Sequence, residues 1–342
     1  MGMWVQRAVG LLLILSALAL ALARAPDVPV EGLVARWALP PSDFIDVKGQ
    51  TVHLRDEGPR HDGDGDGDGD GDGDGGGGGG GGGDGGPPPI VLIHGTSASL
   101  HTWEGWAKAL KGQRRVISFD LPGFGLTGPF VGDHERDNYH GDTYARFVLD
   151  LLDVLQVKRA VIAGNSLGGE VAWRMAAMAP ERVAGLVLVD AVGPRFTPKA
   201  VPLGFMLARV PVLNKLGEWA LPRSMVVEGL HSVYGDPTRV TEALVDRYYE
   251  LALREGNRRA LGLRVRQMVA GEHEERIATL KLPTLILWGG RDRLIPPEVG
   301  AEFERRIAGS RLVVFEHLGH VPQEEDPVLS VAPVKEFLGL NR

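Results

Sequence analysis

Gly164-Asn165-Ser166-Leu167-Gly168 reads G-x-S-x-G, and the residues on either side of this pentapeptide predict its structure. An apolar, β-branched run at 159–163 precedes it, and helix-forming residues follow it as far as Pro180. The pattern predicts a strand, a sharp turn that carries the serine, and a helix. The small residues beside Ser166 let the strand and the helix approach each other closely. This context favours a nucleophilic serine over an ordinary glycine-rich turn.

Apolar runs alternate with helical patterns along most of the 342-residue chain. An alternating hairpin comes first, and continuous apolar strands and amphipathic helices follow it. Such alternation predicts an α/β fold with a mostly parallel, doubly wound sheet of eight strands. The expected strands are 43–47, 50–55, 90–93, 116–119, 159–163, 183–189, 283–288 and 311–315, and the expected helices are 100–110, 143–155, 169–179, 297–307 and one from 327.

The alternation is interrupted between Pro194 and about Leu280. This stretch has helical character, several prolines and no buried strand, so we interpret residues 194–280 as an inserted helical cap. Residues 43–193 and 281–342 then form the two parts of one α/β core. The beginning of the cap is strongly apolar, and its apolar residues either pack against the core or face the site.

An aspartate–glycine tract at 62–86 interrupts the core after the hairpin. It holds eight Asp and seventeen Gly, so it has no apolar area to bury, and we expect a disordered insertion. It lacks the glutamate that closes a calcium-binding loop of the EF-hand type. The net charge of the chain is −7, and the residues outside the tract carry only +1. No basic stripe with interleaved aromatic residues suggests nucleic-acid binding.

A sixteen-residue apolar run, Ala8–Ala23, lies between Arg7 and Arg24. It is short for a membrane span and suits a signal peptide or a signal-anchor, so residues 1–25 predict export or membrane anchoring. The catalytic domain would then lie outside the cytoplasm, with membrane association through the N-terminus. We leave residues 1 to about 40 out of the predicted fold. The chain has no cysteine, which excludes disulfides and a cysteine nucleophile.

A serine hydroxyl needs a base within hydrogen-bond reach, and the base needs an orienting acid. Asp292 and His320 both follow predicted strands, at the same edge of the sheet as Ser166. The chain order Ser, Asp, His is the order of α/β-hydrolases. His317 is the alternative base and Asp190 the alternative acid, although a structural capping role suits Asp190 better.

Five motifs together resemble the α/β-hydrolase fold, in its capped, esterase/lipase-like branch. They are His94-Gly95, Asp120–Gly125, Gly164–Gly169, Gly289–Asp292 and Gly319–Pro322. The resemblance covers residue 43 to the end apart from the aspartate–glycine tract. It implies an oxyanion hole formed by the backbone N–H groups of Leu167 and Thr96, with Ser97 as the alternative to Thr96, and hydrogen bonds from His94 that brace this loop. We expect Gly95, Ser97 and Trp103 to contact substrate, although Trp103 and Trp106 could also simply pack in the core.

The resemblance implies a serine esterase acting through an acyl-enzyme, and the apolar cap points to short- to medium-chain acyl groups. Carbon–carbon-bond hydrolases of the meta-cleavage type share the Gly-Asn-Ser-x-Gly-Gly turn, but they typically carry Trp directly after the catalytic histidine, where Val321 stands here. The motifs also suit a lipase acting on long-chain esters, a serine perhydrolase or a catalytically silent binding protein. We expect a small-molecule ester as the partner, and no metal ion or cofactor. Asp133, His134, Asp137 and His140 cluster in sequence, but their spacing matches no metal-ligand motif.

Overall fold

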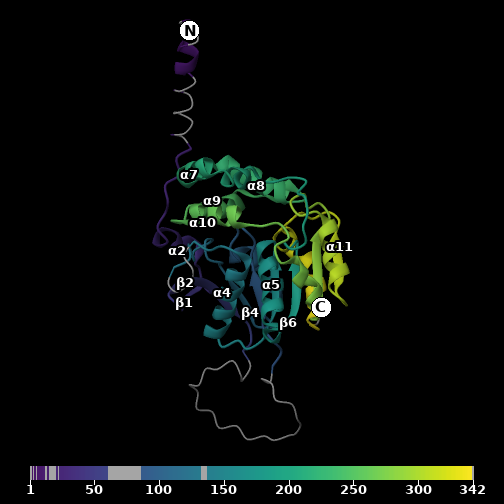
Figure 1. Cartoon of the computed structure of the whole chain (residues 1–342). Helices are drawn as coiled ribbons and strands as arrows, with labels where there is room; N and C mark the ends of the chain where they lie inside the picture. The colour runs from purple at the N-terminus through teal and green to yellow at the C-terminus, as the bar shows by residue number, and fades with distance from the viewer. Residues whose placement is uncertain are drawn as a thin grey trace, which may run out of the picture.

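A computed structural model describes most of the chain (Figure 1). The described residues are 2, 4, 6–11, 14, 21, 23–60, 86–131 and 137–340. The aspartate–glycine tract lies outside them except for Gly86, and the predicted signal peptide or signal-anchor at 1–25 is described only in part. Within the described part of the chain, no helix has both the length and the apolar character needed to cross a bilayer.

Eight strands form one sheet in the order β1-β2-β4-β3-β5-β6-β7-β8. The pairs β1·β2 and β2·β4 are antiparallel, and every other neighbouring pair is parallel. The predicted eight-stranded, mostly parallel α/β sheet is confirmed. The strands are β1 (Asp43–Val47), β2 (Gln50–Glu57), β3 (Ile90–Ile93), β4 (Val116–Phe119), β5 (Ala160–Asn165), β6 (Val183–Val189), β7 (Thr284–Gly289) and β8 (Arg311–Phe315).

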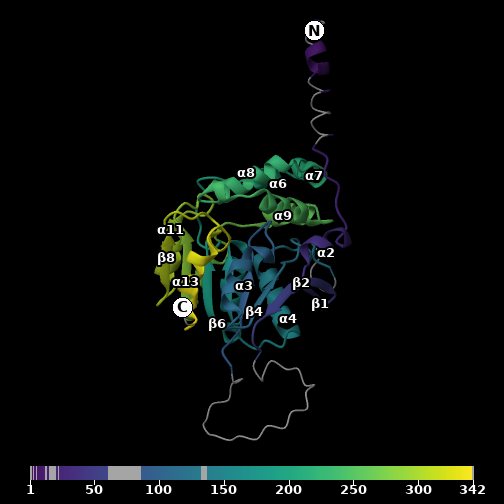
Figure 2. The same cartoon turned by 180° about the vertical axis from the view of Figure 1, so that it is seen from behind.

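Helices cover both faces of the sheet, and the alternation of side chains along a strand explains the two cores. Val91 and Ile93 of β3 join the core beneath α4, α5 and α11, whereas Ile90 and Leu92 join the core beneath α3 and α13. Figures 1 and 2 show these two helical layers from opposite sides. The helices are α3 (Glu104–Leu110), α4 (Gly141–Val154), α5 (Leu167–Met178), α11 (Pro297–Arg306) and α13 (Pro327–Phe337), with short helical turns η1 (Leu100–Trp103), η2 (Pro180–Arg182) and α12 (Pro322–Glu325).

The segment between β6 and β7 is helical and lies above the carboxyl edge of the sheet (Figure 1). We call this segment the cap, after the inserted helical cap that the sequence analysis predicted for residues 194–280. Its helices are α6 (Leu203–Ala208), α7 (Pro211–Trp219), α8 (Arg223–Val233), α9 (Glu242–Ala252) and α10 (Asn257–Gln267), with 3-10 turns η3 (Pro237–Arg239) and η4 (Glu274–Thr279).

Residues 26–42, which the sequence analysis left outside the fold, are part of the folded body. Helix α2 (Glu31–Trp37) packs on α9 and buries Leu33. The indole of Trp37 donates a 2.8 Å hydrogen bond to Glu250, and Arg36 forms an ion pair with the same carboxylate. The sequence pattern missed this helix because its stabilising partners lie more than 200 residues away along the chain.

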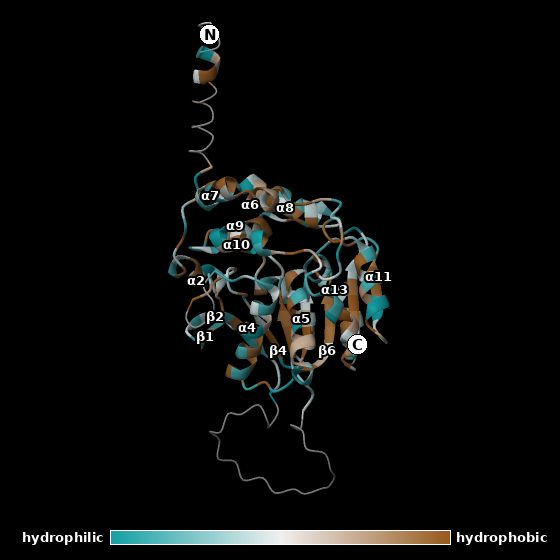
Figure 3. Ribbon diagram, viewed as in Figure 1, coloured by the Kyte–Doolittle hydropathy of each residue, from teal (hydrophilic) through white to brown (hydrophobic). Residues whose placement is uncertain are grey.

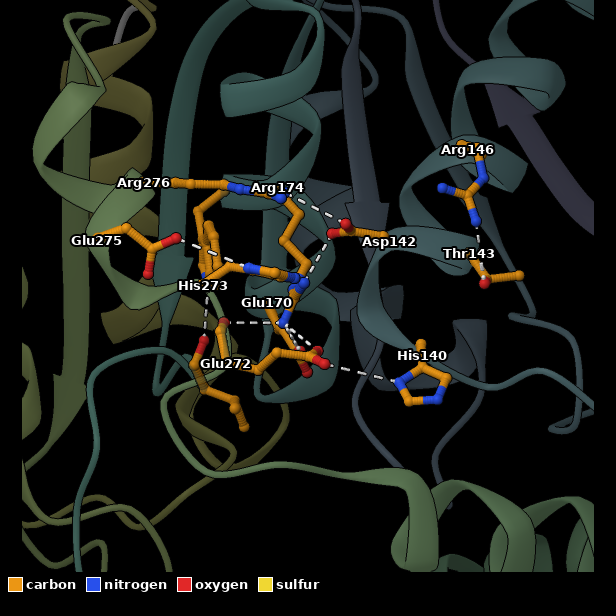
Figure 4. Close-up of polar contacts among 12 residues, drawn as sticks. His140, Asp142, Thr143, Arg146, Glu170, Arg174, Glu272, His273, Glu275 and Arg276 are labelled. Carbon is orange, nitrogen blue, oxygen red and sulfur yellow. Dashed lines mark hydrogen bonds and ion pairs between the residues drawn. The ribbon is translucent and has the colours of Figure 1, made fainter.

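A polar cluster fastens the last part of the cap segment to the core (Figure 4). The guanidinium of Arg174, on α5, forms ion pairs with Asp142 of α4 at 2.7 Å and with Glu272 at 2.9 Å. Arg276 also contacts Asp142, and His140 lies 3.8 Å from Glu272. Because Arg174 is almost fully buried, removing one of its partners would leave a charge poorly compensated. The cluster therefore holds α4, α5 and the 272–276 segment together.

The aspartate–glycine tract is expected to be dispensable, because both of its attachment points lie at the edge of the sheet opposite Ser166. Glu57 ends β2 and Ile90 begins β3, and both pair with Val116 at the start of β4. Deleting residues 62–85 shortens this connection fourfold, which should stabilise the protein by about 1 kcal/mol through the lower entropy of loop closure. Denaturant titration should show this gain in stability, and an activity assay should show turnover within about twofold of the wild type. A collapse in turnover with the fold intact would contradict the prediction.

Candidate active site

Ser166 lies between β5 and α5 in a strained backbone conformation, with φ 56° and ψ −113°. Non-glycine residues rarely adopt a positive φ, and such strain is common at functional sites. The Ser166 N–H donates to Val189 O at 3.0 Å, and Ser166 O accepts from the N–H of Glu170 and of Val192. These backbone hydrogen bonds hold the turn and place the serine at the carboxyl edge of the sheet, as the pentapeptide predicted.

The glycines around Ser166 are required by close backbone contacts. A Cβ on Gly164 would lie 2.1 Å from Gly168 O, and a Cβ on Gly168 would lie 2.0 Å from Ile93 O of β3. Any side chain at either position would force the strand and helix apart. The G-x-S-x-G pattern is thus the steric condition for this turn.

His320 and Asp292 meet beyond the ends of β8 and β7. The Nδ1 atom of His320 lies 2.6 Å from Asp292 Oδ2, and both side chains are buried. Asp292 Oδ1 accepts hydrogen bonds from the backbone N–H groups of Leu294 and Ile295 at 2.8 and 2.9 Å, which fix the orientation of the carboxylate. A proton on Nδ1 leaves Nε2 of the imidazole free to accept another.

Ser166 and His320 line one cavity of about 170 Å³, whereas His317 is exposed and lies beside Arg291. The structure thus brings Ser166, His320 and Asp292 to one place and leaves the alternative base outside it. The three residues follow β5, β7 and β8, which are parallel strands of one sheet whose carboxyl ends lie at the same edge. This is why residues so far apart in sequence converge.

Asp190, the alternative acid, lies buried against the same pair. Its carboxyl oxygens, those of Asp292 and the ring nitrogen of His320 offer atoms within 4.8 Å of one another. Asp190 Oδ1 accepts a 2.9 Å hydrogen bond from Gly289 N–H, and among the described residues no group donates to Oδ2. Burial, and then the neighbouring Asp292, raise the pKa of Asp190 well above its usual range. A protonated Asp190 is therefore an uncharged neighbour of the Asp292–His320 pair.

The loop after β3 approaches the serine closely. A Cβ on Gly95 would lie 3.1 Å from Ser166 Cβ, and Gly95, Thr96 and Ser97 all line the cavity. His94 braces this loop, since its Nδ1–H donates to Gly95 O at 2.7 Å and its Nε2 accepts from Leu121 N–H at 2.9 Å. Burial lowers the pKa of His94, which favours the neutral ring that these two hydrogen bonds require.

Leu167 is the first residue of α5, and the first N–H groups of a helix have no partner within the helix. This N–H and that of Thr96 are the groups predicted to form an oxyanion hole. The structure places both residues beside Ser166, one directly after it and one on the wall of the same cavity.

The walls of the cavity come mainly from the cap and are apolar. Its polar side chains are hydroxyl, amide and imidazole groups, and none of its lining residues is Asp, Glu, Lys or Arg. Cap residues on the walls include Phe205, Met225, Val226, Leu230, Tyr248 and Leu261.

Trp103 does not line this cavity. It is fully buried with Trp106 in the core beneath α3 and α13, at a centroid separation of 5.0 Å. Trp103, which we expected to contact substrate, therefore lies in the core. There the two indoles fill space between the sheet and the helices. An aromatic residue near an oxyanion loop in sequence does not reveal which side of the sheet it faces.

The sequence cluster from Asp133 to His140 is not brought to the active site. Asp133 and His134 lie outside the described residues. Asp137 forms an ion pair with Arg259, and His140 lies near Glu272.

Two residues that organise the site were missed. The amide of Asn165 donates to Val189 O at 3.2 Å and to His320 O at 2.9 Å, so it ties the histidine loop to the serine turn. The buried carboxylate of Glu325 accepts from the N–H groups of Gly235, Asp236 and Gly319, joining the cap to the same loop. Asn165 is the second residue of the pentapeptide, but the pattern did not indicate its role, and no motif pointed to Glu325.

The raised pKa of Asp190 predicts a pH dependence of stability. An unfolded aspartate titrates near pH 4, so above that pH native Asp190 holds a proton that the unfolded chain has lost. The free energy of unfolding should therefore fall as the pH rises towards the raised pKa. Asp190→Asn cannot titrate, so denaturant titrations at pH 5 and pH 9 should show a smaller loss for this variant than for the wild type. Parallel losses would mean that Asp190 is already ionised at pH 5.

Comparison with known proteins places this fold and site in a family. Residues 90–334 match the model of the Alpha/beta hydrolase family. The chain is 32% identical over 243 residues to the dihydrolipoyllysine-residue acetyltransferase component of the acetoin cleaving system of Pseudomonas putida, covering 70% of this chain but only 60% of that protein. It is 30% identical over 262 residues to the 2-hydroxy-6-oxo-2,4-heptadienoate hydrolase of Pseudomonas putida, covering 73% of this chain and 88% of that one.

Among solved structures, the meta-cleavage product hydrolase of Pseudomonas fluorescens IP01 superposes with a TM-score of 0.68 and 25% identity, over 87% of this chain and 97% of the other. The family model spans well over half of the chain and the fold agrees with it. The chain therefore belongs to the α/β-hydrolase family and is, by its fold, a hydrolase.

Proposed function

We propose that this hydrolase cleaves carboxylic esters with short- to medium-chain acyl groups through a serine acyl-enzyme. The observation that supports the proposal is the lining of the Ser166 cavity, which is apolar and has no charged side chain. An uncharged ester loses little hydration free energy in such a pocket, whereas a carboxylate there would lack a countercharge.

In the proposed mechanism, Nε2 of His320 takes the hydroxyl proton of Ser166 as Oγ attacks the acyl carbonyl. The N–H groups of Leu167 and Thr96 donate hydrogen bonds to the oxyanion, and each raises the rate by a factor of about 10²–10³. His320 returns the proton to the leaving alcohol, and an acyl-enzyme remains. A water molecule deprotonated by His320 then attacks the acyl carbon. The acyl–Oγ bond breaks, His320 returns the proton to Ser166 Oγ, and the carboxylic acid leaves. Asp292 keeps the proton on Nδ1 throughout.

Carbon–carbon-bond hydrolysis of the meta-cleavage type is a second candidate, and two observations favour it. Relatives with that activity match most of this chain. Their substrates carry a carboxylate, and Arg258 lies next to the active site, lining a small adjoining cavity together with Ser97 and Ala98. One guanidinium nitrogen of Arg258 donates to Asp27 at 2.5 Å, while Nε and Nη1 are buried without a partner among the described residues. These two nitrogens could bind a substrate carboxylate.

The triad assignment is tested with p-nitrophenyl esters from acetate to palmitate and the full-length chain. We expect turnover to peak at short or medium chains and to be lost in Ser166→Ala. Asp292→Asn should lower kcat by about 10⁴, since the amide stabilises the wrong tautomer of His320. Asp190→Asn should stay within about threefold of wild type, since it keeps a neutral hydrogen-bonding group.

The opposite order of these two aspartate variants would make Asp190 the catalytic acid. A peak at long chains would make the enzyme a lipase. Folded protein with no turnover on any ester would refute the ester proposal.

The two candidate reactions are separated by Arg258→Gln, with Arg259→Gln as the matched control. Arg259 is the next residue on α10, but it is exposed and pairs with Asp137. If the substrate is a carboxylate-bearing dienoate, Arg258→Gln should raise its KM by about tenfold or more, because a charge-assisted hydrogen bond is lost. Under the ester proposal, the dienoate is not turned over and KM for p-nitrophenyl butyrate stays within about twofold in both variants. A dienoate turned over faster than any ester would favour the second candidate.

A further inference from the structure

The outer side of the cap exposes an apolar surface, which we call the α6–α7 face. Seven of the seventeen residues from 203 to 219 are large, apolar and exposed, and Val212 is the most exposed of them at 79%. Soluble proteins rarely expose contiguous apolar patches of this kind without a partner. The brown segments of α6 and α7 lie at the outer side of the cap in Figure 3. The face consists of Leu203, Met206, Val210, Val212, Leu213, Leu216 and Trp219.

Helix α7 turns its apolar face outward, whereas an ordinary surface helix turns that face towards the core. Val212, Leu216 and Trp219 follow the i, i+4, i+7 spacing of one helix face, and that face points outward. Asn214 points inward with 6% exposure, its amide against Gly262 of α10 and donating to Glu218. The sequence analysis expected the apolar residues of this segment to pack or to line the site, and most of them do neither.

The N-terminal chain joins the cap at this same face. Ala25 N–H donates to Trp219 O and Leu221 N–H donates to Ala23 O, both at 3.1 Å. The apolar run Ala8–Ala23 therefore leads directly to the end of α7. The described helical residues 6–11 lie beyond α7, on the side of the cap away from the sheet (Figures 1 and 2).

The charges on this side suit an anionic lipid surface. Arg209 and Lys215 lie within the face and Arg24 beside it, and all three are exposed. The one acidic residue between 203 and 219 is Glu218, which accepts the inward hydrogen bond from Asn214. Apolar residues flanked by exposed cations are typical of segments that lie in the interface of an anionic bilayer. Two copies of this face would instead oppose like charges.

A second cavity lies beside the catalytic pocket, and residues of the α6–α7 face contribute to its lining. It has a volume of about 260 Å³ and is lined by Ala23 and by apolar residues of α6 and α7. It shares Gly204, Leu221, Met225 and Leu261 with the cavity that holds Ser166. An apolar acyl chain entering between α6 and α7 would thus meet no charged wall except Arg258 before it reached the serine.

We propose that the α6–α7 face rests on an anionic lipid surface, and that the adjoining cavity admits apolar substrates from that surface to Ser166. The role of the cavity rests on the proposed function. The docking of the face does not, so the two are tested separately.

Docking is tested with single cysteines in the full-length chain, which has none of its own. Val210→Cys places a probe on the face, and Val154→Cys at the end of α4 is its match, because the two valines are 44% and 45% exposed. Both are made in a Ser166→Ala background, so that lipid is not hydrolysed, and carry a polarity-sensitive fluorophore. With phosphatidylglycerol vesicles, the probe at 210 should shift to the blue and its iodide quenching should fall about fivefold, as expected for a side chain buried at the acyl boundary. The probe at 154 should change less than twofold.

The charge contribution is tested with Arg209→Gln and Lys215→Gln. Each should weaken vesicle binding by about fivefold, and phosphatidylcholine vesicles should bind the unchanged chain less tightly than phosphatidylglycerol vesicles.

Bound protein whose probe at 210 remains as accessible to iodide as the probe at 154 would overturn the proposal, and so would the absence of binding to either lipid. Concentration-dependent protection at 210 without vesicles would show that a second copy covers the face, and concentration-independent protection would show that the N-terminal segment does. Either result would also overturn the proposal that the face rests on lipid.

Substrate admission is tested in the active protein with Gly217→Phe, which adds a large side chain to the second cavity at a residue that does not line the Ser166 cavity. A Cβ at Gly217 meets no atom within 4 Å, so the substitution is compatible with the fold. Turnover of vesicle-embedded long-chain esters should fall at least about tenfold, while p-nitrophenyl acetate in solution stays within about threefold. An equal loss on both substrates would remove the cavity's role and leave the docking result standing.

Discussion

The close contact of three backbone segments around Ser166 is the constraint on which the rest of the site depends. Gly164, Gly168 and Ile93 approach so closely that no side chain fits at the two glycines. The contact forces Ser166 to a positive φ, with the first N–H groups of α5 beside it. The loop after β3 is brought against the serine by the same contact. The nucleophile and its predicted oxyanion donors are thus positioned by backbone packing, which costs no rearrangement during a reaction.

The acid and base are held by a different means. Buried polar groups are stabilised by hydrogen bonds, and several groups here orient one another in this way. Backbone N–H groups fix Asp292, Asp292 fixes His320, and Asn165 fixes the backbone of His320 to the serine turn. Asp190 adds a second carboxyl to this buried group. Two adjacent buried carboxylates cannot both be charged at low cost, and the raised pKa of Asp190 is the consequence.

The inner and outer sides of the cap have different surfaces. Its inner side forms a pocket without charged residues, and its outer side carries apolar residues with two exposed cations. The inner side is the observation that supports the proposed ester substrate. The outer side lies where the N-terminal chain joins α7. The proposed substrate and the proposed lipid contact thus involve the same group of helices.

The sequence by itself determined the eight strands, the helical cap, and the positions of Ser166, Asp292 and His320, because these depend on local periodicity and on short motifs with steric or chemical requirements. Only the tertiary structure decided the rest. Trp103 faces the core, α2 belongs to the folded body, Asp190 meets Asp292, and α7 turns its apolar side outward. The physical reason is that each of these depends on what lies across the contact. A local pattern specifies that a helix has an apolar side, but packing against distant residues determines which way that side points.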